Sequence, residues 1–523
     1  MEKKTILAIF LIIIVFFVSR LFFPTPTVAE KAKELQKQET LTAPTKTTEE
    51  TPTPTKKYIP DNLVEEQNVS VNNSIVLEND KIRVVFSNKG GVIKDVFIKG
   101  YFISETQETV NLIKDYAYNI TVDGESYINK VFNYSNDGKS ITFYLKGVRK
   151  VFTISNEYSL NLQISLYGKP INRYSLDIGS GIKDSETVTK DKSRDYGITA
   201  MVNNQISKIY HSKLKKDDRG ISIDGNVSWI AAYSKYFVIG VLPEKAIDMF
   251  SANSYSTDDA PAFSVNIRDN RTDFTHNYTL YFGTMETANM LSLGAGFEKI
   301  ASRTWKALDW LSKIFIKLLA WLYAVIPNYG VAIILFAIIL KLLLYPLTHK
   351  MYESTQKMQL IQPKVAELQR RFKSDKANLN VELRKLYKQE GVNPLGGCLP
   401  LLLQMPIFFA LYPALKYSIG LRQASFGWWL KDLSVSDPYM ILPVLMGFFM
   451  FLQQKLMMNK KQPSTMDNKQ RSTAQTQKMM MYMMPILMVV IFRNLPAGLV
   501  MYWTVFNVLS IIQQVIINKR FGR

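Results

Sequence analysis

The sequence predicts a polytopic α-helical membrane protein with six spans, five of which form a helical core, and a large external antiparallel β-sandwich. Three observations support this fold class. Apolar runs about as long as a bilayer-spanning helix, which needs ~20 residues, occur at the N-terminus and through the C-terminal half. Residues 61–290 instead contain short alternating runs rich in Val, Ile, Tyr and Phe, as antiparallel strands do. The densest basic stretches lie between apolar runs, which is typical of cytoplasmic loops.

The charge of the chain has three candidate explanations. The 523 residues include 64 Lys and Arg against 44 Asp and Glu, which gives a formal charge of +20. Such a charge suits nucleic acid, an anionic membrane surface or signals that set membrane topology. Because the basic stretches lie between apolar runs, topology is the first explanation, and contact with ribosomal RNA is open as a second use.

The sequence gives no positive sign of catalysis. Its single cysteine, Cys398, excludes an internal disulfide framework and a multi-cysteine metal site. His211, His276 and His349 are scattered without ligand spacing, and no nucleotide-binding loop, nucleophile elbow or zinc signature is present. We therefore expect a protein that is not an enzyme and uses no metal or cofactor.

The N-terminal segment predicts an anchor followed by a linker. Residues 5–23 are apolar and follow Lys3 and Lys4. A cleaved signal peptide has a similar start, but this run is long and bulky and no A-x-A site follows closely. We interpret residues 1–23 as an uncleaved transmembrane anchor with a cytoplasmic N-terminus. Residues 24–60, rich in Pro, Thr, Lys and Glu, predict a disordered linker.

Residues 61–297 form the predicted β-sandwich domain. Turn signals such as KGG at 89–91 and NDG at 136–138 separate its alternating runs. Many short strands over roughly 230 residues are typical of an antiparallel sandwich. Four acidic residues with interleaved lysines are interpreted as a solvated loop: Asp184, Glu186, Asp191 and Asp195.

Residues 298–326 predict one amphipathic helix. Its large apolar residues recur at three- and four-residue steps: Trp305, Leu308, Leu311, Phe315, Leu318 and Leu322. A helix packed on the sandwich has a similar pattern. The tryptophans and lysines next to a spanning segment favour a helix in the outer membrane–water interface.

The second predicted span, residues 327–348, contains one charge, Lys341. At ~1.5 Å per residue, Lys341 lies roughly 10 Å inside the span when counted back from His349. A cation at that depth costs on the order of 2.5–3.5 kcal/mol. Its ammonium either reaches the headgroups along the lipid-facing surface or faces a wet cavity inside the protein, and this segment alone leaves both open.

Residues 349–391 are polar and basic and predict a cytoplasmic αα-hairpin with a break near residues 374–378. Residues 392–517 contain the third to sixth spans. The last two spans are separated at residues 493–496 by the sequence RNLP. A basic cytoplasmic loop at 458–478 and a short basic tail at 518–523 place both chain ends inside.

The membrane part resembles the YidC family of membrane protein insertases, whose relatives include the mitochondrial oxidase-assembly and chloroplast Albino proteins. The resemblance covers residues 330–517 and depends on six ordered matches: YPLT (345–348), QPKV (362–365), VNPLGGCLPLLLQMPIFFALY (392–412), LRQASF (421–426), DPYMILPVLMG (437–447) and LPAGLVMYW (495–503). The anchor, linker and external domain match the six-span form with a periplasmic β-supersandwich.

The resemblance implies a hydrophilic groove that carries one basic residue, commonly arginine. Lys341 occupies that position; as a point charge it cannot offer arginine's bidentate recognition, but it still attracts acidic residues. The implied groove residues are Lys341, Gln404, Gln453, Asn507, Tyr502 and Trp503, and an apolar slide is formed by Leu403, Pro406, Phe408 and Phe409. For the polar and aromatic members, hydrogen bonding between helices or an aromatic belt is the alternative. Gln513 and Gln514 are interpreted as approaching the inner interface.

The cytoplasmic hairpin resembles the family's substrate-recruiting element, with Lys364, Arg370, Arg371, Arg384 and Lys385 as its basic residues; a solvated topology signal is the alternative. The implied function is insertion and folding of integral membrane proteins in the inner membrane, alone or with the Sec translocon. The implied partners are nascent membrane proteins, the Sec translocon, membrane lipids, and as further candidates the signal recognition particle receptor and the ribosome. A polytopic transporter or channel with a periplasmic binding domain is the alternative function.

Overall fold

The computed structural model describes residues 70–103, 106–155, 157–168, 170–186, 192–216, 220–244, 251–257, 260–305, 307–372, 375–392, 399–457 and 482–520. All of them belong to one unit, Glu66–Arg523. The predicted anchor, linker and basic loop 458–478 lie outside the described residues.

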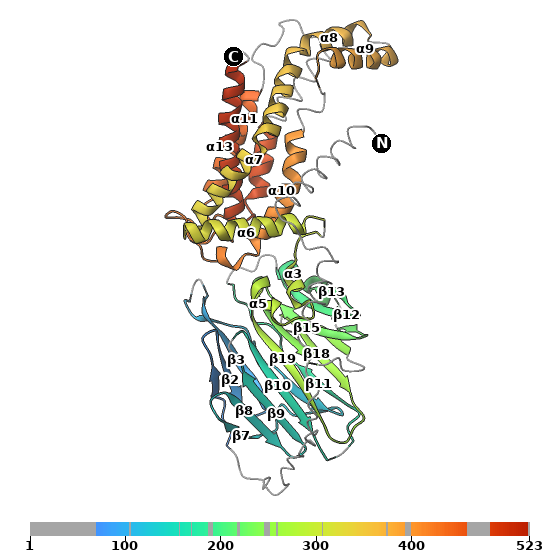
Figure 1. The fold of residues 1–523 in the computed structure, drawn as a ribbon, viewed down its shortest axis with the longest axis vertical. Coiled ribbons are helices and arrows are strands. Elements are labelled where there is room, and N and C mark those ends of the chain that lie inside the picture. Colours follow the sequence, from blue (N-terminus) through green and yellow to red (C-terminus); the bar gives the residue numbers. More distant parts are fainter. Residues whose placement is uncertain are drawn as a thin grey trace, which may run out of the picture. The chain divides into compact units, whose positions relative to one another are not determined.

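Three antiparallel sheets form the sandwich domain (Figure 1). The first has the order β1 (Ile75–Glu78), β2 (Ile82–Ser87), β3 (Val92–Phe102), β4 (Thr109–Asn111). The largest has the order β13 (Gln205–Tyr210), β12 (Gly197–Val202), β15 (Val227–Tyr233), β16 (Phe237–Pro243), β19 (Phe274–Thr284), β10 (Ser159–Leu166), β9 (Val148–Ile154), β8 (Ser140–Leu145), β7 (Asn133–Asn136). The third has the order β14 (Ile221–Ile223), β17 (Ser251–Thr257), β18 (Ala260–Arg268), β11 (Arg173–Asp177), β5 (Asn119–Val122), β6 (Glu125–Ser126).

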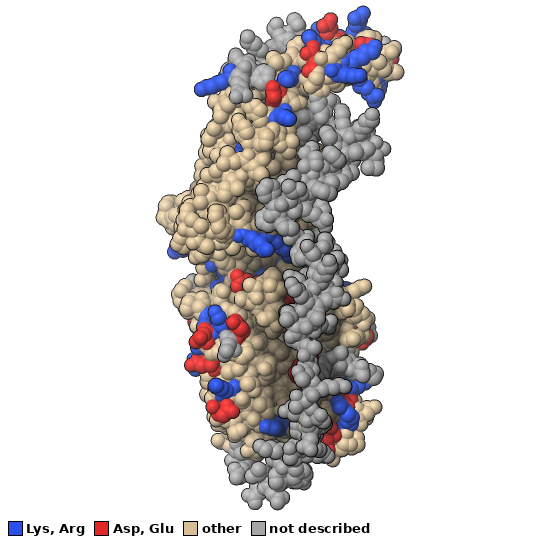
Figure 2. Space-filling model, in the orientation of Figure 1, with Lys and Arg blue, Asp and Glu red and all other residues tan. Residues whose placement is uncertain are grey.

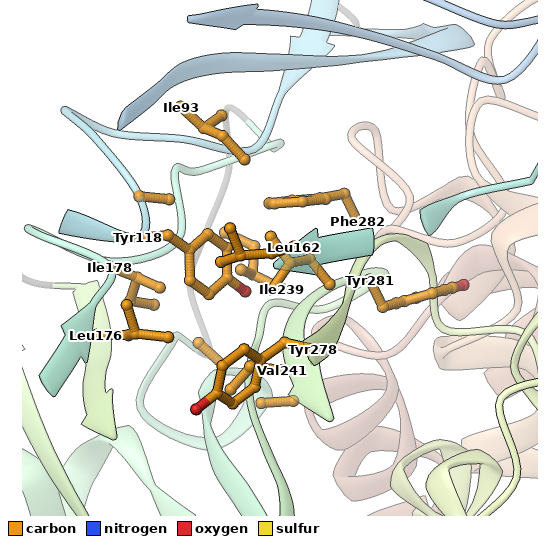
Figure 3. Close-up of a cluster of buried hydrophobic side chains, with 14 of the residues drawn as sticks. Ile93, Tyr118, Leu162, Leu176, Ile178, Ile239, Val241, Tyr278, Tyr281 and Phe282 are labelled. Atoms are coloured by element: carbon orange, nitrogen blue, oxygen red, sulfur yellow. The ribbon is translucent and has the colours of Figure 1, made fainter. Parts of the chain in front are cut away.

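The sheets share one hydrophobic core because alternate side chains of each strand point inward. On β10, Leu160, Leu162 and Ile164 are buried and are separated by more polar residues. Figure 3 shows Leu162 among aromatic and aliphatic side chains from several strands. The buried Tyr118 hydroxyl donates to the Gly240 carbonyl at 2.9 Å, so this aromatic side chain has its polar end satisfied inside the core.

Both predicted turns lie between consecutive paired strands. The KGG turn at 89–91 connects β2 to β3, and Gly90 and Gly91 have φ values of 79° and 54°, which favour glycine. The NDG turn connects β7 to β8, and the Asp137 carboxylate accepts from the Lys139 amide at 2.8 Å. Both turn predictions are confirmed.

The acidic loop interpretation is wrong for two of its four residues. Glu186 is bonded to Arg422, and Asp195, which ends the short helix α3 (Lys192–Asp195), is bonded to Lys416. Asp195 is buried, and both carboxylates gain cationic partners more than 200 positions away. Asp184 pairs with Lys192 nearby, and Asp191 lies outside the described residues.

The segment predicted as one amphipathic helix over 298–326 forms two elements, η2 (Phe297–Ala301) and α6 (Asp309–Val325). The described residues between them, 302–305 and 307–308, are not helical; there the Ser302 carbonyl accepts from Lys208 and the Arg303 side chain donates to the Ser234 carbonyl. The α6 face that includes Phe315 and Leu322 is buried, as the periodicity predicts. Figure 1 shows α6 crossing near the ends of α7 and α10, and it packs on both helices.

The helix predicted to end at Thr348 continues much further. α7 runs over Tyr329–Leu360 and passes through Pro346. Its last turns are followed by α8 (Gln362–Arg371) and α9 (Lys376–Gln389), which form the hairpin. Asp375 caps α9 by accepting from the Asn378 amide at 3.0 Å, so the break lies where the sequence predicts it.

The remaining described helices are α10 (Leu399–Lys416), η3 (Ile419–Leu421), α11 (Ile441–Met457), an apolar helix over Tyr482–Phe492, and α13 (Ala497–Arg520). The predicted break at 493–496 separates the last two. Within the described residues, α7 and α13 are long and apolar enough to span a membrane, and three further apolar helices are shorter. A helical membrane region is therefore present, while the count of six spans stays a prediction.

Candidate functional site

Lys341 lies on the inward face of α7. Its neighbours Leu342 and Leu343 are 66% and 72% exposed, whereas Lys341 is 4% exposed. Successive residues of a helix point in different directions, so the apolar pair covers the outer surface while the lysine turns into the bundle. The ammonium therefore points toward other helices and does not extend along the outer surface of α7.

The Lys341 ammonium is held by α13. Nζ donates to Ser510 Oγ at 2.7 Å and lies 4.5 Å from the centre of the Phe506 ring. Lys341 Nζ also lies 5.6 Å from the centre of the Tyr352 ring, which is eleven residues further along α7. Ser510 Oγ also donates to the Phe506 carbonyl at 2.8 Å. No carboxylate of the described chain pairs with this cation, so its hydrogen-bond acceptor is a neutral hydroxyl.

Two further predicted site residues bind tyrosines on neighbouring helices. Gln453 of α11 donates to the Tyr352 hydroxyl at 3.2 Å. Gln404 of α10 donates to the Tyr502 hydroxyl of α13 at 3.0 Å, and both side chains are buried. The Tyr502 and Phe506 rings are 5.9 Å apart, so the Gln404–Tyr502 pair lies next to the contacts of Lys341 along α13.

Asn507 and Trp503 lie on the same helix without contacting Lys341. Asn507 is 6% exposed, and its Nδ2 has no hydrogen-bond partner among the described residues. An unpaired buried donor costs about 1–3 kcal/mol and marks a place where a water or ligand group can bind. Trp503 packs edge-on against Phe408 and Phe492, with ring centres 5.7 Å and 5.1 Å away.

The predicted apolar slide follows two faces of α10. Phe408 packs on Trp503 inside the bundle, while Phe409 stacks on Trp305 at 5.0 Å. Leu403 and Pro406 are half-buried. The Phe408 and Phe409 ring centres lie 5.6 Å apart, and the apolar slide stays a prediction.

A row of polar side chains continues from Lys341 along α7 and α13, and we call it the polar seam. Its contacts are Thr348 Oγ1 with Gln513 Nε2 at 3.1 Å, Gln356 Nε2 with Asn518 Oδ1 at 2.9 Å, and Gln514 Nε2 with Asn518 Oδ1 at 2.7 Å. Gln513 and Gln514 are 2% and 1% exposed, so they bind other side chains inside the protein. Their interpretation as residues approaching the inner interface stays a prediction.

Sequence reasoning missed five members of this site: Ser510, Tyr352, Thr348, Gln356 and Asn518. A signal was present. On α7 the polar positions 341, 348, 352 and 356 are seven and four residues apart, and on α13 the positions 507, 510, 514 and 518 are three and four apart. Such spacings place each set on one helix face. Two matching polar stripes on apolar helices predict that the helices meet there.

The basic residues of the hairpin lie at its surface. Arg370, Arg371, Arg384 and Lys385 are exposed, and Figure 2 shows Lys and Arg side chains gathered on α8 and α9. Lys364 pairs with Glu390 at 2.6 Å across the hairpin, and Lys385 pairs with Glu382 at 2.7 Å. A small core around Val365 and Val392 holds the two helices together.

Known proteins resemble this chain along nearly its whole length. The family described as "60Kd inner membrane protein" matches residues 321–523, and that described as "YidC periplasmic domain" matches residues 74–322. A membrane protein insertase YidC of Geotalea uraniireducens is 31% identical over 550 residues and covers 99% of each chain. Another from Geobacter sp. (strain M21) is 33% identical over 487 residues and covers 86% of each. A crystal structure of an active YidC insertase is 19% identical, covers 85% of this chain and 92% of its own, and has a TM-score of 0.35.

The matched families associate residues 74–322 with periplasmic domains and residues 321–523 with inner membrane proteins. The names of the relatives do not favour the transporter or channel alternative. Because the two matches together cover the chain from residue 74 to its end, and relatives above 30% identity cover most of both chains, this chain belongs to the YidC family.

Proposed function

We propose that this chain inserts and folds integral membrane proteins, and that Lys341 and the polar seam form the place where a substrate's polar tail enters the bilayer. One observation carries the proposal. The Lys341 ammonium lies inside an apolar bundle, 4% exposed, and its hydrogen-bond acceptor is the neutral Ser510 hydroxyl. A buried cation without a carboxylate attracts an anionic partner, because opposite charges interact more strongly where water is excluded than in bulk water.

The physical problem is to move a polar tail across hydrocarbon. Each unsatisfied backbone group there costs several kcal/mol. The polar seam offers hydrogen-bonding amides and hydroxyls from Lys341 to Asn518, which shortens the dry distance that the tail must cross. As the helices part, an acidic residue of the tail displaces Ser510 from Lys341.

The substrate leaves the polar seam because its apolar segment is more stable in lipid. The substrate's apolar segment moves into lipid, and its burial drives insertion without a nucleotide. The orphaned Asn507 donor and the Gln404–Tyr502 pair supply further polar contacts beside the path. Trp503 and Phe408 line it with aromatic surface, and Leu403, Pro406 and Phe409 are the remaining members of the apolar slide.

The topology that suits this function has six spans, both termini in the cytoplasm and residues 24–326 in the periplasm. The exposed basic hairpin α8–α9 then lies in the cytoplasm, where Arg370, Arg371 and Arg384 meet nascent membrane proteins first. The Sec translocon is the partner for larger substrates, and the signal recognition particle receptor, the ribosome and anionic lipids are further candidates for the basic surface. No catalytic step is needed.

The test uses purified full-length protein in liposomes free of translocon. A newly synthesised one-span protein with a short acidic external tail is added, and insertion is scored by protease protection. We expect insertion by the wild type and Lys341→Arg, and loss with Lys341→Ala. Lys350→Ala, an exposed lysine on the same helix, is the matched control and should insert normally.

Two outcomes would contradict the proposal at different points. Insertion by all variants would show that the cation is not needed for this substrate. No insertion by the wild type, with rescue by a co-reconstituted translocon, would show that the chain does not insert proteins by itself.

A further inference from the structure

The connection between α10 and α11 forms an ion pair and hydrogen bonds with the sandwich through one basic residue, Arg422. Its Nε donates to Glu186 Oε1 at 2.7 Å, and its Nη2 donates to the carbonyls of Phe102 at 2.7 Å and Ser185 at 3.1 Å. Arg422 is 8% exposed, and the neighbouring Gln423 donates to the same Phe102 carbonyl at 2.6 Å. The guanidinium thus uses its fork of donors on three acceptors of the sandwich.

A second buried ion pair fixes the last residue of α10. Lys416 Nζ lies 3.0 Å from Asp195 Oδ1, and the two side chains are 9% and 8% exposed. The Tyr417 hydroxyl donates to the same carboxylate oxygen at 2.9 Å. Asp195 therefore binds two successive residues at the point where α10 ends.

Arg303, in the chain segment before α6, contacts the same residues, Asp195 and Tyr417. It donates to the carbonyls of Asp195 at 3.1 Å and Ser234 at 2.9 Å, and its guanidinium lies 4.4 Å from the Tyr417 ring centre. Lys235 donates to the Ser434 carbonyl at 3.2 Å, near the other end of the connection. The connection is thus held at both of its ends.

We propose that the sandwich is a positioning element for α10, and that Arg422–Glu186 and Lys416–Asp195 are the two ion pairs that lock it to the outer end of that helix. The inference goes beyond the proposed function and does not depend on it. α10 also carries Gln404, twelve residues before Lys416, so a fixed outer end also fixes the angle at which α10 meets α13.

The lock serves geometry more than net stability. Burial raises the pKa of the Glu186 carboxyl in spite of the neighbouring Arg422 guanidinium. Taking both charges out of water therefore offsets much of their attraction, as in other buried pairs. Removing one partner is a different change, because it leaves the other charge buried and alone. The test must follow the local order of the connection, since a global melting point reports mainly the cores.

The experiment is hydrogen–deuterium exchange on the full chain in detergent, read over residues 417–423 and the last turn of α10. Arg422→Met and Lys416→Met should each raise amide exchange there by at least about tenfold, the population change expected from losing one charge-assisted hydrogen bond. Lys431→Met, an exposed lysine in the same connection, is the matched control and should change nothing. Exchange in the sandwich core shows that each variant is folded.

Two companion variants separate the ion pair from packing. Arg422→Lys keeps the charge but loses the fork, so we expect an intermediate increase in exchange. In Arg422→Met/Glu186→Gln the stranded carboxylate is gone, so exchange should fall back toward that of the wild type. Unchanged exchange in both single methionine variants, or a double variant worse than the sum of its single changes, would overturn the proposal.

Discussion

Among the residues that the structure describes, Lys341 and Lys150 are both buried and donate to neutral acceptors, but the groups around them differ. Lys341 meets one hydroxyl, Ser510, and two aromatic rings. Lys150, on β9, is fully buried in the sandwich core and donates to the carbonyls of Gly91 and Tyr118. The backbone acceptors of Lys150 belong to the rigid core, so that lysine is structural. Ser510 is a single side-chain hydroxyl, 1% exposed between α7 and α13, and under the proposed function an acidic group replaces it when the helices part.

Lys150 predicts a pH dependence of stability. Burial lowers the pKa of Lys150 from 10.5 to about 7, against the attraction of Asp177. In the unfolded chain the lysine keeps its ordinary pKa, so unfolding takes up a proton between about pH 7 and 10.5. Stability therefore rises with pH in this window, by at most about 1.4 kcal/mol per pH unit, and loses this contribution as pH falls toward 7.

The measurement is the thermal midpoint of the full chain in detergent between pH 7 and 9.5. Lys150→Met should flatten the rise, because the titrating group is gone. Lys81→Met, an exposed lysine of the same domain, should keep it. Equal slopes in both variants would assign the pH dependence to other groups.

At the scale of elements, local signals were predicted well and long-range partners were not. The KGG and NDG turns and the break at 493–496 are set by residues within a few positions, and the structure has all three. α7 continues to Leu360 because its polar last turns are buried against α13 through pairs such as Gln356–Asn518. Glu186 pairs with Arg422, which is 236 positions away in the sequence. The residue pattern of neither segment predicts this contact.

Helix contacts also depend on small residues, and Gly447 gives a prediction. A Cβ added at Gly447 of α11 would lie 2.4 Å from Val489 Cγ2 on the neighbouring apolar helix. Gly447→Ala should therefore push the two helices apart and cost about 1–3 kcal/mol, as overpacking does. Val489→Ala shortens the facing side chain, so the double variant should recover most of the loss in thermal midpoint. If the double variant had the same thermal midpoint as Gly447→Ala, the loss of stability would come from the backbone at residue 447 and not from the contact with Val489.

At the scale of the whole molecule, polar chemistry is distributed unevenly along the bundle. Between Lys341 and the C-terminal end of α7, which leads to α8, the polar seam has amides and hydroxyls on both α7 and α13. Toward the other end, the buried residues of α7 are glycine, alanine and large apolar side chains. Under the proposed function, a polar tail that enters from the α8–α9 end meets the polar seam as far as Lys341, and beyond it meets Asn507 and the Gln404–Tyr502 pair among apolar side chains. Lys341 is then the charged contact at the end of the polar seam.

This position predicts that Lys341 selects substrates by the charge of the tail. In liposomes, a tail with two acidic residues should insert about tenfold better than the same tail with two lysines, which corresponds to ~1.4 kcal/mol of differential attraction. Lys341→Met removes the cation but keeps an unbranched side chain. The two tails should then insert almost equally, because the acidic tail inserts more slowly than it does with the wild type. Lys350→Met, on the exposed surface of α7, should keep the full preference. If Lys341→Met kept it as well, the selection would come from the basic surface of α8–α9, and charge reversal at Arg370 and Arg371 would be the change that abolishes it.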